Sequence, residues 1–459
     1  MTENQESLRA TARNLPAWRH SEAIVEAVRS HQVVVIEGPT GSGKTTQVPQ
    51  MLLEAGLAGA GIALTQPRRI AAVSIAWRVA AELGVAVGGD VGYSIRFDDC
   101  SGPETRIRVM TDGILLQEAR NDPDFERYGV IIVDEAHERT LNIDFTLGLL
   151  HLALKRRADL RLVISSATLD PGRFQAFYAS LGRDVPLVSI DARPHPVTIR
   201  YRGWSGGDAR EMAEAMAAEI ADLHREAPPG DVLAFLSGEA GIKRTMESLA
   251  RRGVARSAEI IPLYGALPRE EQERIFAPAG DRRRVVLSTN IAETSITVPG
   301  IRYVIDSGQA KVPRVSASSG IRALREEGIS IASAEQRAGR AGRTAPGTAI
   351  RLYTRGWLER QPPFSDPEVL REDLREVVLR LIDLGIHDLE GFPFPTEPPR
   401  RRLKSAIAQL QAMGAIDANL RLTDIGRRMA PFPLSPPLAR AVVEAADRHP
   451  ESLADVLAA

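Results

Sequence analysis

A glycine-rich segment near the N-terminus has the residue types and spacing of a phosphate-binding loop. It reads Gly38-Pro-Thr-Gly-Ser-Gly-Lys-Thr45, directly after a predicted strand and before a predicted helix. Glycines let backbone N–H groups close around phosphate oxygens, and the start of the helix adds partial positive charge. We expect Lys44 to contact the β- and γ-phosphates of a nucleoside triphosphate and the Thr45 hydroxyl to bind Mg²⁺. The other residues expected to hold the nucleotide here are Gly38, Thr40, Gly41, Ser42, Gly43 and Thr46.

A second chemical signal is an acidic pair that follows an apolar run. Val130–Val133 leads directly into Asp134-Glu-Ala-His137. In an open parallel sheet, ligands lie at the carboxyl ends of strands, which favours Asp134 as a magnesium ligand acting through water. Glu135 is then the candidate general base that orients the attacking water. Such a pair can also cap a helix, but the phosphate loop upstream favours the catalytic role. We expect His137, beside the base, to link the nucleotide to the second lobe.

Arginines near residue 340 are candidates for stabilising a transition state. The segment Gln336-Arg-Ala-Gly-Arg-Ala-Gly-Arg343 places Gln336, Arg340 and Arg343 at helical spacing on one face. Arginine fingers neutralise the charge that develops during phosphoryl transfer, so Arg340 and Arg343 are expected to contact the γ-phosphate and Gln336 to position water. A solvated basic helix is the alternative. The interspersed alanines and glycines argue against it, because they permit close approach to another surface.

These groups require elements that bring them together, and the pattern of the chain is α/β. Short β-branched runs at residues 32–37, 62–65, 130–133 and 162–165 are typical of buried parallel strands, with helical patterns at 71–83 and 144–155 between them. After a break at Arg193-Pro-His-Pro196, a second series follows, with strands at 232–236, 285–288 and 303–306. Two parallel-sheet lobes are therefore predicted, and catalysis is expected between them. Beyond residue 362 the pattern becomes helical, with helices at 370–384 and 401–414.

Composition limits the class of protein. Of the 459 residues, 44% are hydrophobic and 25% are charged, which suits several globular domains. Cys100 is the single cysteine, the N-terminus has no apolar signal core, and no apolar run has the length of a membrane helix. These features favour a cytoplasmic protein without membrane contact, and we expect a monomer. The net charge of -1 shows that any nucleic-acid track must be local.

Taken together, the ordered motifs resemble those of DEAH/RHA-type superfamily 2 ATP-dependent RNA helicases, including bacterial DEAH-box helicases. The resemblance covers nearly the whole chain from Asn14. The motifs that carry it are Gly38–Thr46, Thr65-Gln-Pro-Arg-Arg69, Thr111-Asp-Gly113, Asp134–His137, Ser166-Ala-Thr168, Phe235-Leu-Ser-Gly238, Ser288-Thr-Asn-Ile-Ala-Glu-Thr-Ser295 and Gln336–Arg343.

The resemblance implies roles for residues that spacing alone does not assign. Ser166 and Thr168 match the segment that couples hydrolysis to lobe movement, although they are also suited to capping a strand end. Thr294 matches a nucleotide sensor. The segments that hold the RNA backbone in this family correspond to Gln66 together with Pro67, Arg68, Arg69, Thr111, Asp112, Gly113, Ser237, Gly238, Thr289 and Asn290. Short hydroxyls, turn amides and arginines contact phosphates without recognising bases.

The resemblance also implies the arrangement of domains. We expect a RecA-like ATP-binding lobe over residues 1–192, a second RecA-like lobe over 193–362, a winged-helix domain over 363–430 and the truncated start of a helical ratchet domain over 431–459. A strand-separating hairpin is expected between Lys311 and Ile331, with strands at 312–315 and 328–331. Many members stack an aromatic residue near position 309 on the base, opposite an arginine matching Arg78. Gln309 is not aromatic, so other NTPs besides ATP are expected to be accepted; Arg78 is equally compatible with a surface role.

The function expected from the resemblance is RNA-stimulated NTP hydrolysis with ATP and Mg²⁺, coupled to 3′-to-5′ translocation on single-stranded RNA and to duplex unwinding. Two alternatives stay open. One is a nucleotide-switched clamp or scaffold that binds RNA without unwinding it. The other is action on DNA, because backbone contacts alone do not distinguish the two nucleic acids.

Overall fold

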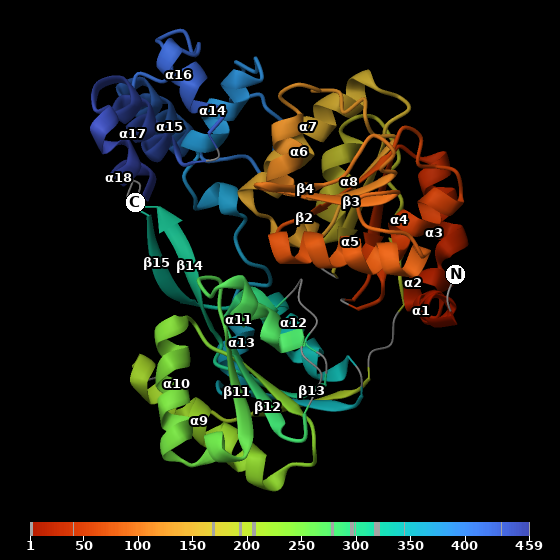
Figure 1. Ribbon diagram of the computed structural model, residues 1–459, viewed down its shortest axis with the longest axis vertical. Helices are drawn as coiled ribbons and strands as arrows, with labels where there is room; N and C mark the ends of the chain where they lie inside the picture. The colour runs from red at the N-terminus through yellow and green to blue at the C-terminus, as the bar shows by residue number, and fades with distance from the viewer. Residues whose placement is uncertain are drawn as a thin grey trace.

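The structure is a computed structural model with two open sheets and a helical C-terminal region (Figure 1). It describes residues 3–39, 41–167, 170–191, 195–203, 208–276, 280–293, 298, 300–315, 322–343, 345–432 and 434–458. We call the unit around the first sheet lobe 1 and the unit around the second sheet lobe 2. The predicted class, two lobes of parallel sheet and helix followed by a helical region, is confirmed.

Lobe 1 contains an eight-stranded sheet in the order β4-β3-β5-β2-β6-β7-β1-β8, parallel except for the β3–β4 pair. Its strands alternate between two apolar faces, because Val34 and Ile36 enter one core and Val33 and Val35 the other. The strands are β1 (Val33–Glu37), β2 (Ile62–Gln66), β3 (Val91–Ile95), β4 (Asp98–Cys100), β5 (Ile107–Thr111), β6 (Val130–Val133), β7 (Arg161–Ser166) and β8 (Leu187–Ser189). The four strands expected from sequence are central members of this sheet.

Helices cover both faces of this sheet. The core on one face is completed by α2 (Pro16–Arg19), α3 (Ser21–Ser30), α4 (Lys44–Glu54) and α5 (Arg69–Leu83). The core on the other face includes α6 (Asp112–Glu118), α7 (Leu141–Arg156) and α8 (Pro171–Ala179). Helix α1 (Glu3–Arg13) lies against α5. This layering brings the carboxyl ends of β1, β2 and β6 to one edge of the sheet.

Lobe 2 contains a six-stranded parallel sheet in the order β11-β12-β10-β13-β16-β9. Its strands are β9 (Val197–Tyr201), β10 (Asp231–Phe235), β11 (Ala258–Leu263), β12 (Arg283–Ser288), β13 (Ile301–Asp306) and β16 (Gly347–Arg351). Helices α9 (Ala209–Glu226) and α10 (Glu239–Arg251) pack on one face. The other face is covered by α12 (Ile331–Gly339) and short 3₁₀ turns; α11 (Arg269–Glu273) and α13 (Arg355–Glu359) complete the lobe.

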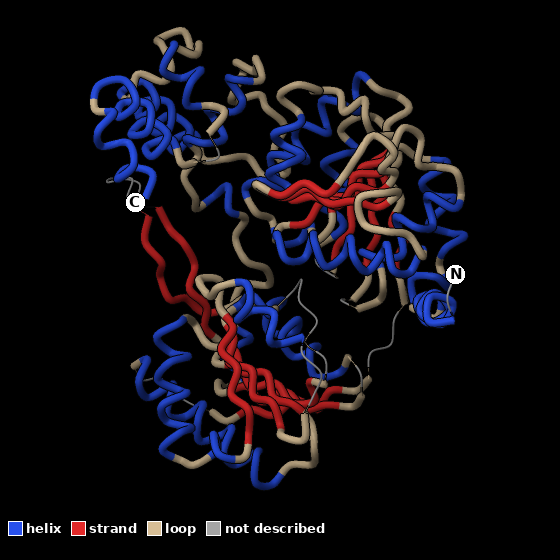
Figure 2. The backbone as a smooth tube through the Cα atoms, in the orientation of Figure 1, coloured by secondary structure: helices blue, strands red, loops and turns tan. Residues whose placement is uncertain are grey.

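A two-stranded antiparallel ribbon projects from lobe 2 (Figure 2). It consists of β14 (Gln309–Val315) and β15 (Arg322–Gly328), with Lys311 opposite Glu326. The first predicted strand is correct, but the second, at 328–331, is wrong. Ser330 instead caps α12 by accepting a hydrogen bond from the Ser333 N–H, at 3.2 Å. A capping serine therefore ends the ribbon before Ile331 and starts the helix.

The C-terminal helices do not pack as an independent unit. They are α14 (Arg375–Asp383), α15 (Arg400–Ala412), α16 (Asp424–Met429), α17 (Pro436–Arg448) and α18 (Leu453–Ala458), with a small antiparallel bridge between Ile416 and Leu422. Their apolar residues share one core with α6, α7 and α8 of lobe 1. The rings of Phe145 on α7 and Phe392 meet edge to face at 5.6 Å. The chain thus leaves lobe 2 and returns to lobe 1.

Within the part of the chain that the structure describes, no helix is both long and apolar enough to cross a bilayer.

Candidate functional site

The phosphate loop connects β1 to α4 at the edge of the lobe 1 sheet. Gly41 and Gly43 have φ values of +88° and +91°, a left-handed conformation that favours glycine. Gly38 is needed for space, because a Cβ there would lie 2.9 Å from the Ile190 Cβ. The Gly38 N–H donates to the Ser166 carbonyl at 3.2 Å. The loop is therefore a backbone cradle attached to the end of β7.

Lys44 begins helix α4 and is buried inside this cradle. Its Nζ donates to the carbonyl of Gly38, to that of Pro39 at 3.1 Å and to Ser42 Oγ at 3.4 Å. Burial lowers the pKa of Lys44, while the carboxylates of Glu135 and Asp134 oppose that change. An ammonium group held by carbonyls at the mouth of the loop is suitably placed to bind phosphate oxygens. Thr46, next on α4, accepts a hydrogen bond from the Gln47 amide at 2.7 Å.

Thr45 and Asp134 converge where a magnesium ion would be held. The Thr45 hydroxyl donates to Asp134 Oδ2 at 2.5 Å, and the Gln66 amide donates to the same oxygen at 2.7 Å. One hydroxyl and one carboxylate fit Mg²⁺ in NTPase sites, which takes its other oxygens from water and phosphate. No cluster of three or more His, Cys, Asp or Glu side chains that could hold a metal occurs among the described residues, so no all-protein cage is present.

Glu135 follows Asp134 in a strained backbone conformation. Its φ is 51°, and Arg139, on the other side of the short 3₁₀ turn Ala136–Glu138, has φ 47°. Non-glycine residues in this region cost about 1–3 kcal/mol each, so surrounding contacts must hold the turn. Burial, together with the charges of Asp134 and Glu138, raises the pKa of Glu135 to about 8. A buried carboxyl with a raised pKa is suited to general-base chemistry.

His137 lies between Glu135 and the end of β7. The Ala167 N–H donates to His137 Nδ1 at 3.3 Å, which puts the ring proton on Nε2, and Nε2 lies 3.5 Å from Glu135 Oε2. Burial lowers the pKa of His137 to about 4, so the ring is neutral near pH 7. Ser166, beside Ala167, is buried. These contacts are within lobe 1, and the expected link from His137 to lobe 2 stays a prediction.

Arg340 and Arg343 come from lobe 2 and act on the same carboxylate. Helix α12 ends at Gly339, and a 3₁₀ turn over Arg340–Gly342 directs the arginines. Burial and the like charge of Arg343 lower the pKa of Arg340, and burial lowers that of Arg343 to about 10, each opposed by the charge of Glu135. The charge of Glu135 on lobe 1 therefore influences the pKa of both arginines on lobe 2. The expectation that the two lobes share one catalytic site stays a prediction.

Gln336 faces the cavity between the lobes. Its Nε2 is a buried donor for which the described residues supply no hydrogen-bond partner. A buried amide donor of this kind needs a water or a ligand atom. The expected role of Gln336 in positioning water stays a prediction.

Glu293 and Arg337, which the sequence did not single out, fix the position of the arginine segment. The fully buried Arg337 pairs with Glu293 at 2.9 Å and with Asp306 at 2.8 Å. The Glu293 carbonyl accepts a bond of 3.0 Å from Arg340 Nε. Glu293 thus holds both arginines in place. The only sign in the sequence that Glu293 has a role is its place in the motif around Thr289. Its bonds to Arg337 and Arg340 depend on the tertiary fold.

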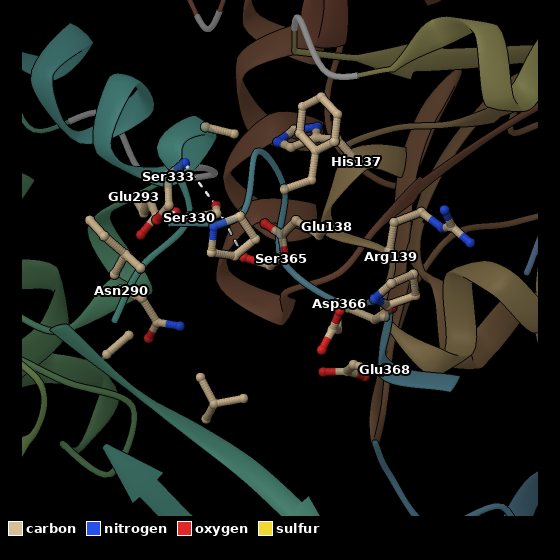
Figure 3. Close-up of a pocket in the computed structure, with 18 of the residues that line it drawn as sticks. His137, Glu138, Arg139, Asn290, Glu293, Ser330, Ser333, Ser365, Asp366 and Glu368 are labelled. Atoms are coloured by element: carbon tan, nitrogen blue, oxygen red, sulfur yellow. Dashed lines mark hydrogen bonds between the residues drawn. The ribbon is translucent and has the colours of Figure 1, made fainter. Parts of the chain in front are cut away.

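A cavity of about 300 Å³ lies next to this site, between the two lobes. Figure 3 shows Glu138 and Arg139 of lobe 1 on one side, and Glu293, Ser330 and Ser333 of lobe 2 on the other. The connector, which we define as residues 362–372, forms a third wall through Ser365, Asp366 and Glu368.

Of the residues after β2 that are expected to contact RNA, some lie at the surface and one lies between the lobes. Arg69 is exposed and Pro67 is half-buried, as an RNA-contacting surface requires. Arg68 donates to the Ile291 carbonyl of lobe 2 and to Glu138 Oε1 at 3.3 Å, so it bridges the lobes. The expectation for Gln66 is wrong, because this buried side chain bonds Asp134 and so lies at the magnesium side of the strand end.

Among the residues before and in α6, the side chain of Asp112 is not on the surface. It is buried, and burial raises its pKa to about 7. The Asp112 carboxyl is therefore not placed for direct RNA contact. Thr111, at the N-cap of α6, and Gly113 are only half-buried.

Ser237 and Gly238 contact the two-stranded ribbon of β14 and β15, which forms the expected hairpin. The Ser237 hydroxyl donates to Glu326 Oε2 at 3.0 Å, and a Cβ on Gly238 would lie 3.0 Å from the Lys311 side chain. Asn290 is exposed and lines the interlobe cavity, next to the half-buried Thr289. These four residues are therefore on the side of lobe 2 that carries the hairpin.

Arg78 is half-exposed and pairs with the buried Glu82, which also accepts hydrogen bonds from Gln47 and Gln50 at 2.8 and 2.7 Å. This pairing leaves both interpretations of Arg78 open. Three expected residues, Thr40, Thr168 and Thr294, lie outside the described residues.

Comparisons with known families match three consecutive parts of the chain. Residues 18–176 match the DEAD/DEAH box helicase family, and residues 214–345 match the helicase conserved C-terminal domain. Residues 406–434 match the winged-helix helicase associated domain, HA2. The matches follow the order of lobe 1, lobe 2 and C-terminal helices.

Curated relatives of high similarity are bacterial. The chain is 42% identical over 441 residues to the ATP-dependent RNA helicase HrpA of Borreliella burgdorferi, covering 96% of this chain and 53% of that protein. It is 43% identical over 441 residues to the HrpA of Escherichia coli, covering 94% of this chain and 33% of that protein. The chain thus spans about a third to a half of the length of these relatives.

Solved structures agree on the architecture. The Escherichia coli DEAH/RHA helicase HrpB superposes with a TM-score of 0.86 at 36% identity, covering 96% of this chain and 55% of that chain. A second structure, of the Escherichia coli DExH-box NTPase HrpB, has a TM-score of 0.82 at 37% identity, covering 94% and 52%. These matches confirm the predicted pair of RecA-like lobes with a winged-helix region.

Proposed function

The chain belongs to the DEAH-type helicase family, and from that premise we propose that it is an RNA-stimulated ATPase that unwinds RNA duplexes. The observation that carries the proposal is the contact between the two lobes that carry the expected catalytic groups. Lys44, Thr45 and Asp134 come from lobe 1 and Arg340 and Arg343 from lobe 2, and the two lobes are in contact where Arg68 donates to the Ile291 carbonyl. Because the set is divided between two lobes, movement of one lobe relative to the other would make or break it, which ties hydrolysis to movement.

In the proposed reaction, water attacks the γ-phosphorus and ADP leaves. Glu135 orients the water and accepts its proton, next to the neutral ring of His137. Lys44, Arg340 and Arg343 stabilise the charge that develops on the γ-phosphate oxygens. Thr45 and Asp134 would hold Mg²⁺, which when bound would supply positive charge to the phosphates. Gln336 places its amide toward the water.

The motor part of the proposal uses the residues around the interlobe cavity. Closing and opening of the lobes moves Arg68, Arg69 and Thr111 of lobe 1 relative to Ser237, Thr289 and Asn290 of lobe 2. If each group holds the phosphates of one strand, each cycle of hydrolysis shifts the chain along that strand. We propose 3′-to-5′ movement in the cytoplasm by a monomer, with the family resemblance as support.

Strand displacement tests this proposal. The full chain, ATP and Mg²⁺ are mixed with an RNA duplex carrying a 3′ overhang, and with a matched duplex carrying a 5′ overhang. We expect free strands from the first duplex and ATP hydrolysis that rises when RNA is added. A Lys44→Ala variant should give neither. Stimulated hydrolysis without strand separation would instead support the nucleotide-switched clamp.

Two specificities are tested in the same assay. Replacing RNA by DNA of the same sequence asks whether 2′-hydroxyl contacts contribute, because phosphate contacts alone would stimulate equally. Replacing ATP by GTP, CTP or UTP asks whether the base is selected. With Gln309 in place of an aromatic residue, we expect turnover of all four.

A further inference from the structure

The connector between lobe 2 and the winged-helix region contacts both the hairpin and the loop that carries Glu135. The first residues of the connector contact the N-terminus of α12. The carbonyls of Pro362 and Pro363 accept hydrogen bonds from the Ile331 and Ala332 N–H groups at 3.0 and 3.1 Å. The connector then lines the interlobe cavity through Ser365, Asp366 and Glu368 (Figure 3) and leads to α14. The connector is therefore in a position to carry force between elements that lie far apart in the sequence.

At its lobe 1 end, Glu368 of the connector fixes the strained turn after Glu135. The Glu368 N–H donates to the Arg139 carbonyl at 3.0 Å, and its Oε2 accepts from the Leu141 N–H at 2.9 Å. Arg139 is one of the two left-handed residues that bound the turn. Its guanidinium also donates to Thr396 at 2.8 Å. The conformation of this turn, and with it the direction of Glu135, therefore depends on residues that follow lobe 2.

At its hairpin end, Arg371 joins the connector to β14. Arg371 Nη1 donates to the Pro313 carbonyl at 3.2 Å. Its Nη2 lies 3.5 Å from Glu368 Oε1, and both side chains are largely shielded from solvent, at 13% and 26% exposure. Arg314, also on β14, lies 3.7 Å from Asp366 of the connector. A displacement of β14 is thus passed to Arg371, then to Glu368 and then to Arg139.

We propose that Glu368 and Arg371 are positioning residues that relay the position of the hairpin to the loop carrying Glu135. Nucleic acid that presses on the hairpin then changes the rate of ATP hydrolysis without touching the nucleotide. This inference rests on the proposed function, since it requires RNA-stimulated hydrolysis. It adds a route of coupling that is separate from the direct contacts of RNA with the lobes.

Variants of the full chain test the relay. Arg371→Ala removes the bond to the hairpin, and Glu368→Gln weakens the pairing with Arg371 while keeping an acceptor for Leu141. Glu376→Gln is the control, because Glu376 makes a comparable ion pair with Arg380 on α14, away from the relay. Basal and RNA-stimulated kcat and the KM for ATP are measured with an oligouridylate and with a 3′-overhang duplex. Thermal unfolding of each variant is measured in parallel.

We expect Arg371→Ala to lower the stimulation by duplex RNA by about fivefold or more, the lower end of site-to-site coupling, with little change in KM. Glu368→Gln should have a smaller effect in the same direction, and the double variant should be no worse than Arg371→Ala alone. The control should match the parent chain. Restoration of part of the stimulation by Arg371→Lys, which returns a donor, would support the relay further.

Three outcomes would overturn the relay: full stimulation in Arg371→Ala, independent losses that multiply in the double variant, or equal losses of basal and stimulated turnover with a lowered Tm. The last would mean that these residues only stabilise the fold. A parent chain that hydrolyses ATP at the same rate with and without RNA would refute the proposed function instead. The two failures are therefore distinguishable.

Discussion

The turn that holds Glu135 is bounded by two residues in left-handed backbone conformations, and neither is a glycine. Strain of this kind persists only where the surrounding structure enforces it, and it fixes the direction of the side chain. The direction of the Glu135 side chain therefore depends on a backbone conformation that a flexible loop would not maintain.

Replacing Glu135 by glutamine tests the base directly. Glu135→Gln keeps the size and hydrogen bonding of the side chain but cannot accept the proton, so kcat should fall by roughly 10²–10⁴ while ATP still binds. Single-turnover hydrolysis and nucleotide binding measure the two effects. Turnover at the parent rate would remove Glu135 from this role.

Arg340→Ala is expected to spare ATP binding and to reduce kcat by roughly 10³, the lower end for an arginine finger. Because Arg340 also donates to the Glu293 carbonyl, thermal unfolding must be measured as a control. Equal losses of affinity and turnover would count against the finger role.

His151 on α7 should make stability depend on pH. Its ring packs on Phe177 and Tyr178 and is nearly inaccessible, and burial lowers its pKa from 6.5 to about 4. The unfolded chain therefore binds the proton first as the pH falls, so stability is lost between about pH 6.5 and 4. The contribution is at most about 3 kcal/mol. His151→Gln should show a smaller loss over this range in chemical denaturation at each pH; an unchanged profile would contradict this.

At the scale of residues, the sequence is most informative where the chemistry is local. Lys44, Thr45 and Asp134 follow from short motifs whose flanking strand and helix fix their geometry. Gln66 and Asp112 point inward because of neighbours on other strands, and nothing in their immediate sequence indicates those neighbours. For the same reason, Glu293, Arg337 and Glu368 acquire their roles only through contacts made by the fold.

At the scale of elements, α7 is the helix that joins lobe 1 to the C-terminal region. Gly148 lies where α7 meets Phe392 and Pro393, and a Cβ there would overlap both. Gly148→Ala should therefore destabilise the protein by about 1–3 kcal/mol, the usual effect of overpacking, although alanine favours helix. Chemical denaturation measures the change.

The matched control is Gly241 on α10, where an added Cβ would meet only the Leu236 side chain, at ordinary distances of 3.8 and 3.9 Å. Gly241→Ala should be neutral or stabilising by up to about 1 kcal/mol. If both substitutions behaved alike, close packing at Gly148 would not be the cause.

Elements with a strong apolar pattern were predictable, and those held by charge were not. The central strands β1, β2, β6 and β7 are continuous apolar runs and were located within one or two residues. Strand β15 has the sequence Arg-Ala-Leu-Arg-Glu-Glu-Gly, in which apolar and polar residues do not alternate. A two-stranded ribbon buries little on either face, so its strands do not need such an alternation. The helix expected from Leu370 begins at Arg375, where Asp373 Oδ1 accepts from the Arg375 N–H at 2.9 Å.

For the whole molecule, the net charge of -1 implies that RNA binding depends on local groups and not on bulk attraction. Contacts with phosphates release counterions, so log Kd should rise with log salt with a slope of about 0.7 per phosphate contacted on single strands. Fluorescence anisotropy with an oligouridylate at several salt concentrations measures the slope. A flat profile would contradict binding through the backbone.

The return of the C-terminal helices to lobe 1 has a consequence for biosynthesis. The apolar side of α6 and α7 is covered by residues that leave the ribosome only after all of lobe 2 has been made. At roughly 5–20 residues per second, that face waits on the order of ten seconds or more without its partner. While lobe 2 is being synthesised, lobe 1 therefore exposes an apolar surface to which chaperones can bind. A fragment that ends before residue 363 should aggregate when it is expressed alone.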